Sequence, residues 1–145
     1  MQMHEASFML ARYKIYRGKR PPNDLLPSGT RQDTRWRTKH PLRPSEAIVK
    51  EFLAAPGEQA WSRFRTAYLD LLESRFIDDR APFDNLAALV KSADVYLGCS
   101  CPTELNPRVD HCHTFLWVTW VYRFSRAVST DLRFARSNAT RQRTA

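Results

Sequence analysis

All three cysteines of the chain lie close together in the sequence, and two of its four histidines flank the last of them. Cys99 and Cys101 stand in the run Gly-Cys-Ser-Cys-Pro, and Cys112 is enclosed between His111 and His113. Thiols and imidazoles act as nucleophiles and as acid–base groups, and they are also the side chains that zinc prefers as ligands. This stretch is therefore the candidate functional site.

One interpretation of the cluster is the active site of an enzyme. Cys112 would be the nucleophile, with His113 or His111 as its acid–base partner. Glu104 would orient the histidine, and Cys101 would lie beside them. Adjacent residues of a helix do not face each other, so helical spacing alone does not bring His113 to Cys112.

A second interpretation is a zinc site, and zinc is the one cofactor that the sequence suggests. The ligands would be Cys99, Cys101, Cys112 and His113, with His111 as the alternative histidine. The spacing Cys-x-Cys is less usual than Cys-x-x-Cys, and the other half of the set is a contiguous His-Cys-His.

The residues around the cluster predict a strand, a loop and the start of a helix. Residues 94–101 suit a short buried strand, which Pro102 closes. Asp110 is a favourable N-cap for an apolar run, so a helix is expected over 111–128. Cys112 would then lie in the first helical turn, where free N–H groups favour a thiolate or a bound phosphate.

The net charge of +8 is unevenly distributed along the 145 residues. Residues 12–43 contain ten Lys and Arg against two acids, residues 51–94 contain five against eight, and residues 123–145 contain six against one. Two basic ends around an acidic middle predict an anionic partner such as a nucleotide or a nucleic acid. The alternative reading of this charge is a basic protein with a solvated tail. Beside the enzyme and the zinc site, a non-catalytic nucleic-acid-binding module is the third possible function.

A long basic loop is predicted over residues 21–44, which are rich in Pro, Gly, Ser and Arg and show little periodicity. The candidate ligand-binding residues in and just before this loop are Arg17, Arg20, Arg35, Trp36 and Lys39. Trp36 between two arginines would stack a nucleobase beside a phosphate clamp. The alternative is a tryptophan that anchors the loop onto the core.

The remaining elements predict one α/β domain over residues 1–136, followed by a flexible basic tail at 137–145. Strands are expected within 8–16, within 94–101 and within 131–135, and helices over 45–54, 58–75, 84–92 and 111–128. Ser45 and Asp84 are the expected N-caps of the first and third helices. We expect a compact three-layer domain with a short, mostly parallel sheet and about four helices.

A cytoplasmic protein without a membrane partner is expected, because no apolar run reaches the length of a membrane span and the start of the chain lacks the apolar core of a signal peptide. Three clustered cysteines, an odd number, are not the pattern of a disulfide framework. The sequence predicts no oligomeric state.

The run at residues 98–102, followed by Cys112 and His113 and preceded by the apolar residues 86–90, resembles the signature of a bacterial family of uncharacterised proteins catalogued as domain of unknown function 488. The similarity lies mainly over residues 84–124, and residues 16–21 resemble the family's first strand and the loop after it. The resemblance implies a compact three-layer α/β domain and no established activity.

The resemblance also implies roles for single residues. Cys101 takes the place of the family's first cysteine, Glu104 that of its acid, and Cys112 and His113 that of its Cys-His pair. Thr114 stands where the family usually has Arg, which is a natural clamp for phosphate. Without that Arg, the charge must come from Arg17, Arg20, Arg35 or Lys39, or anion binding is lost. We expect the chain to bind, and as an enzyme to process, a nucleotide-like or other phosphate-bearing ligand at this Cys/His site.

Overall fold

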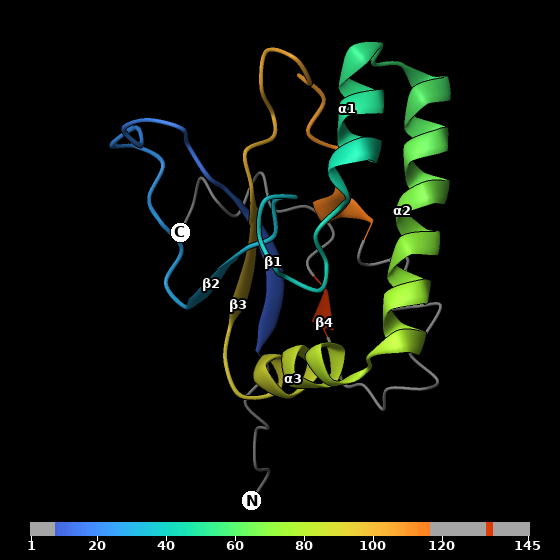
Figure 1. Ribbon diagram of the computed structural model, residues 1–145. Coiled ribbons are helices and arrows are strands. Elements are labelled where there is room, and N and C mark those ends of the chain that lie inside the picture. Colours follow the sequence, from blue (N-terminus) through green and yellow to red (C-terminus); the bar gives the residue numbers. More distant parts are fainter. Residues whose placement is uncertain (1–7, 117–132, 135–145) are drawn as a thin grey trace, which may run out of the picture.

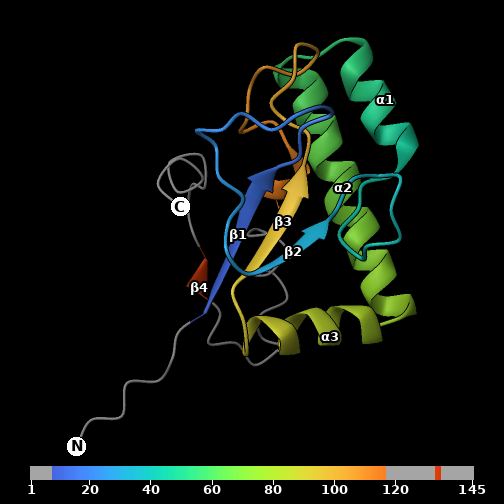
Figure 2. The same cartoon turned by 90° about the vertical axis from the view of Figure 1, so that its left-hand side faces the viewer.

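A computed structural model of the chain describes residues 8–116 and 133–134, and the statements below refer to these residues. A parallel sheet with the strand order β2-β3-β1-β4 lies at its centre. The strands are β1 (Met9–Lys14), β2 (Thr30–Asp33), β3 (Val95–Cys99) and β4 (Arg133–Phe134). Because every strand pair is parallel, the strands end at a common edge, where the segment after β3 also lies (Figure 2).

The two central strands explain why the sheet forms. β3 is buried along its whole length, as expected for a strand that is paired on both sides and covered on both faces. In the register of β1 with β3, Leu10 lies opposite Val95 and Lys14 opposite Cys99. Leu10 and Val95 belong to the main core. Ala11 and Tyr96, the next residues along each strand, point to the opposite face and belong to a second, smaller cluster. The predicted strands within 8–16, 94–101 and 131–135 are thus confirmed.

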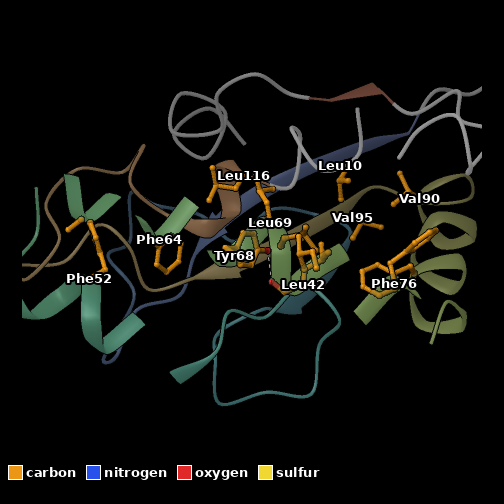
Figure 3. Packing of buried hydrophobic residues seen from close by; sticks show 14 residues of the cluster. Leu10, Leu42, Phe52, Phe64, Tyr68, Leu69, Phe76, Val90, Val95 and Leu116 are labelled. Atoms are coloured by element: carbon orange, nitrogen blue, oxygen red, sulfur yellow. Dashed lines mark hydrogen bonds between the residues drawn. The ribbon is translucent and has the colours of Figure 1, made fainter. Parts of the chain in front are cut away.

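Three α-helices contribute to the main core. α1 (Glu46–Ala54) and α2 (Glu58–Asp78) run side by side along one face of the sheet, and α3 (Ala81–Val90) crosses the end where the strands begin (Figure 1). Tyr68 of α2 is fully buried at the centre of this core, and its hydroxyl donates a hydrogen bond of 2.6 Å to the carbonyl oxygen of Leu42 (Figure 3). The core therefore joins the helices, the sheet and the segment before α1.

The helix boundaries test the predicted caps. Ser45 is the N-cap of α1, as predicted, and its hydroxyl accepts a hydrogen bond of 3.3 Å from the amide of Ile48. The predicted cap at Asp84 is wrong, because α3 already begins at Ala81 with Pro in its first turn, a position that proline favours. Asp84 instead forms an ion pair of 3.2 Å with Arg80.

The predicted helix over 111–128 begins differently from the expectation. Its described part is a 3-10 turn, His113–Phe115, with Cys112 in an extended conformation before it, and residues 117–128 lie outside the described residues. Asp110 does not cap this turn and is paired with Arg108 at 2.7 Å. The described residues thus contain three α-helices rather than about four, and all three pack into one core. The third layer and the tail at 137–145 remain predictions.

The segment 21–44, predicted as a loop, contains β2. Its sequence Thr-Arg-Gln-Asp has no apolar residue, so periodicity could not reveal a strand whose stability comes from pairing with β3. Gly29 leads into β2 with a φ of 143°, and a Cβ there would lie 2.9 Å from the carbonyl oxygen of Asp94, so the close approach requires glycine. Within the part of the chain that is described, no helix combines the length and the apolar character needed to cross a membrane.

Candidate functional site

The three cysteines converge with His113 beyond the carboxyl end of β3. The ligand atoms of Cys99, Cys112 and His113 all lie within 4.8 Å of one another, and the three residues are buried. The thiol of Cys101 lines the same cavity and accepts a hydrogen bond of 3.5 Å from Nδ2 of Asn106. No disulfide joins them, so three free thiols and one imidazole share a single site.

Two hydrogen bonds fix the orientation of the His113 ring. Its Nε2 lies 2.8 Å from Oγ1 of Thr34, and that hydroxyl donates to the carbonyl oxygen of Gly98 at 3.0 Å. A hydroxyl has one proton to donate, so Thr34 accepts the second bond from the Nε2–H of His113. We therefore assign the Nε2–H tautomer to the neutral ring, and this leaves the Nδ1 lone pair 3.7 Å from Sγ of Cys112.

The contact between the neighbouring residues Cys112 and His113 differs from the geometry of a helix. Cys112 is extended, with φ −136° and ψ 145°, and the 3-10 turn begins only at His113. This change of conformation turns the two side chains toward each other. The objection that adjacent helical residues cannot meet therefore does not apply at this position.

A second set of hydrogen bonds reaches Cys112 from the opposite end of the sequence. Oγ1 of Thr114 lies 3.2 Å from Sγ of Cys112 and accepts a hydrogen bond of 2.9 Å from Nε of Arg12. Another guanidinium nitrogen of Arg12 donates to the carbonyl oxygen of Cys101 at 2.7 Å. Arg12 was not among the predicted site residues, because alternation of charged and apolar residues in a strand usually places the charged ones toward solvent. In this sheet the same face is buried.

The three thiols differ in their tendency to ionise. Burial alone would raise the pKa of Cys112, but hydrogen bonds from the thiols of Cys101 and Cys99 and the charge of His113 hold that pKa well below its usual value. Interaction with Cys112 and burial raise the pKa of Cys101 to about 12, although Cys99 and Asn106 act in the opposite direction. The pKa of Cys99 is also raised well above its ordinary value, by its bonds to the other two thiols and by burial. Cys112 is therefore the most acidic of the three thiols.

A cavity of about 610 Å³ adjoins the cluster. The three cysteines and His113 line it together with apolar side chains of α1 and α2 such as Phe52 and Phe64. Its lining also includes Arg17, which lies just before the segment 21–44, and three residues of that segment, Arg35, Trp36 and Arg37. Nucleophilic, cationic and aromatic groups thus share one space.

The predicted ligand-binding residues divide into two groups. Arg17, Arg35 and Trp36 line the cavity, whereas Arg20 and Lys39 do not. Arg35 is held by Asp33 at 2.7 Å, and Arg20 by Asp24 at 3.0 Å.

Two arginines of the cavity make no ion pair within residues 8–116 and 133–134. Arg17 is exposed, and Arg37 lies with its guanidinium carbon 5.0 Å from the ring centroid of Trp36. Arg37 was not predicted as a site residue, although its place next to Trp36 in the sequence was the available signal.

Two other predicted residues lie apart from the dyad of Cys112 and His113. Glu104 is exposed and lines a second hollow of about 520 Å³, so the residue that orients His113 is Thr34. His111 stacks on Trp61, with ring centroids 4.8 Å apart. The histidine that faces a cysteine is thus His113, and His111 packs against α2.

The comparisons with known proteins give one match. A family model described as the active DUF488-N3 subclade matches residues 6–123, a range that includes every residue of the site described above. No curated protein and no solved structure matches the chain.

Proposed function

We propose that this chain, which belongs to the DUF488 family as the match over residues 6–123 shows, is an enzyme that binds and processes a phosphate-bearing, nucleotide-like ligand. The family membership confirms the resemblance found in the sequence, and the description of the subclade as active fits a working site. One observation carries the proposal. Sγ of Cys112 and Nδ1 of His113 face each other at 3.7 Å in the wall of a cavity that Arg17, Arg37 and Trp36 also line.

The chemistry that this pair supports is nucleophilic substitution. As the sulfur of Cys112 forms a bond to an electrophilic centre of the ligand, its proton passes to Nδ1 of His113. The departing group then takes that proton from Nδ1. Thr34 keeps the ring in place throughout, because its hydroxyl accepts from Nε2–H on the far side of the imidazole.

The ligand class follows from the other groups in the cavity. Arg17 and Arg37, neither of which makes an ion pair within the described residues, supply positive charge for phosphate oxygens. Trp36 offers an aromatic face on which a nucleobase can stack. The cavity volume of about 610 Å³ lies in the range of small-molecule sites. A nucleic acid presents the same phosphate and base groups and would be recognised by the same residues.

Ligand binding is tested with nucleoside monophosphates, nucleoside triphosphates and inorganic phosphate, measured by calorimetry at low salt. We expect the double variant Arg17→Gln/Arg37→Gln to lose binding of the nucleotides. Arg63→Gln is the matched control, since Arg63 lies on α2 in an exposed ion pair with Glu51. Wild-type protein that binds none of the three probes contradicts the proposed ligand class.

A second candidate function is a zinc site, and the clustering of the ligand atoms of Cys99, Cys112 and His113 within 4.8 Å favours it. Cys101 would be the fourth ligand or would lie beside an open position at the cavity. The bond of His113 Nε2–H to Thr34 is the outer-shell support that metal-binding histidines usually have. A bound zinc ion would polarise a ligand in the cavity or stabilise the loop.

The two functions are separated by elemental mass spectrometry of the purified protein. About one zinc per chain, lost in Cys112→Ser, would establish the metal site. No zinc in wild-type protein that has been kept from chelators would remove it and leave Cys112 as a free nucleophile. We further propose a cytoplasmic location, because three free thiols fit a reducing compartment.

A further inference from the structure

We propose that Arg12 and Thr114 are positioning residues that hold the sulfur of Cys112 as a hydrogen-bond acceptor and direct it toward His113. The inference rests on the proposed function, since it takes Cys112 as the reacting group. It assigns a role to two residues of which one, Arg12, lies in the first strand, far from the cysteines in the sequence.

The direction of each hydrogen bond follows from the donors available. A guanidinium can only donate, so Oγ1 of Thr114 accepts the 2.9 Å bond from Nε of Arg12. The hydroxyl proton of Thr114 is then directed to Sγ of Cys112 at 3.2 Å. The guanidinium of Arg12 thus donates to the hydroxyl of Thr114, and this hydroxyl donates to the sulfur of Cys112.

The guanidinium itself is fixed in place. A further nitrogen of Arg12 donates to the carbonyl oxygen of Cys101 at 2.7 Å, and the guanidinium carbon lies 5.4 Å from the ring centroid of Phe115. These contacts tie β1 to the loop after β3 and to the 3-10 turn. Arg12 thus holds Thr114 from a rigid strand rather than from a mobile loop.

Water is excluded from this set of bonds. Arg12, Thr114 and Cys112 are 1%, 2% and 3% exposed. A buried guanidinium costs stability, and an apolar side chain beside Leu10 would pack without that cost. In a dry environment the same charge polarises a hydrogen-bonded hydroxyl more strongly than in water. The position of Arg12 is therefore better explained by its action on the site than by packing.

As a consequence, the sulfur of Cys112 lies between a hydrogen-bond donor and a hydrogen-bond acceptor. The sulfur receives a hydrogen from Thr114 on one side, and Nδ1 of His113, which lies 3.7 Å away, is the acceptor on the other. These two contacts fix the position of the sulfur between the hydroxyl of Thr114 and the imidazole of His113.

The test is the rate at which iodoacetamide alkylates each cysteine at one fixed pH, followed by mass spectrometry of the peptides. We expect Cys112 to react faster than Cys101 in the wild type. Thr114→Val, which removes the hydroxyl at nearly constant volume, should slow the labelling of Cys112 about tenfold, because a hydrogen bond to a charged group is lost. Thr114→Ser should restore the rate. Thr66→Val, at an exposed position of α2, is the control.

Each outcome has a separate meaning. Wild-type protein in which Cys112 reacts no faster than Cys101 contradicts the proposed function and removes the premise. A fast wild type with an equally fast Thr114→Val protein overturns the positioning role alone. Equal slowing by Val and Ser at position 114 also overturns it, because the effect then comes from packing. Circular dichroism checks folding, and Thr114→Ala takes the place of the valine variant if that protein does not fold.

Discussion

The hydrogen bond between Thr34 and His113 allows a direct measurement of how firmly the site is held. Thr34→Val removes the hydroxyl and keeps a side chain of similar volume. The carbonyl oxygen of Gly98 retains the backbone bond of 3.0 Å from the Thr34 amide, so the loss falls on Nε2 of His113. A buried donor without a partner costs about 1–3 kcal/mol, so we expect the free energy of unfolding to fall by about 2 kcal/mol.

Thr34→Ser is the matched variant, because it keeps the hydroxyl and loses one methyl group, which is worth about 0.8 kcal/mol. Urea unfolding of the three proteins measures both changes. With a slope of about 1–3 kcal/mol per molar urea, the valine variant should unfold at a midpoint lower by about 1 M. Equal destabilisation by Val and Ser would show that packing, not the hydrogen bond, is lost.

The tautomer of His113 gives an independent reading of the same bond. Nitrogen-detected NMR of the imidazole should show the proton on Nε2 in wild-type protein, because Thr34 accepts there. A neutral ring with its proton on Nδ1 would refute the assignment, and with it the transfer of the Cys112 proton to that nitrogen.

Three further predictions concern the surroundings of the site. Burial lowers the pKa of His40 from 6.5 to about 4, so the neutral imidazole stabilises the fold fully above pH 6.5 and this stabilisation is lost as the pH falls toward 4. His40→Gln should therefore flatten the dependence of the free energy of unfolding on pH in this window, measured by urea unfolding. An unchanged dependence would contradict the assignment. In Gly98→Ala the new methyl group would lie 2.7 Å from ring atoms of Tyr13, so we expect a loss of about 1–3 kcal/mol in thermal unfolding, and a variant as stable as the wild type would show that the ring moves freely. Tyr68→Phe leaves the buried carbonyl of Leu42 without its 2.6 Å hydrogen bond and should cost about 1–2 kcal/mol in urea unfolding, whereas no change would mean that water replaces the hydroxyl.

The parts of the fold that the sequence predicted are those in which local pattern and burial agree. The apolar run of β3 and the cap at Ser45 are local signals, and both appear where expected. β2 has no such signal, since its four polar residues form a strand only because β3 lies beside them. The sequence pattern therefore predicted β1, β3 and β4 but not the edge strand β2.

The site shows the same limit. The cysteines and His113 were found because their residue types are chemically distinctive and lie close together in the sequence. Glu104 was expected to orient the histidine because it takes the place of the family's acid, but the residue that bonds to His113 is Thr34, 79 positions away. Arg12 was not predicted because a charged residue that alternates with apolar ones in a strand usually faces solvent, whereas both faces of β1 are buried here. Partners that are distant in sequence carry no local pattern.

The bonds that complete the site join residues that a ribosome produces at very different times. Arg12 and Thr114 are 102 positions apart, and Thr34 and His113 are 79 positions apart. Pairing of such distant segments is slow and comes late in folding. The hydrogen bond from Arg12 to Thr114, through which Cys112 is held, therefore requires that β1 has come together with the segment after β3. Under the proposed function, the reacting sulfur is thus held in place only after the distant segments around it have met.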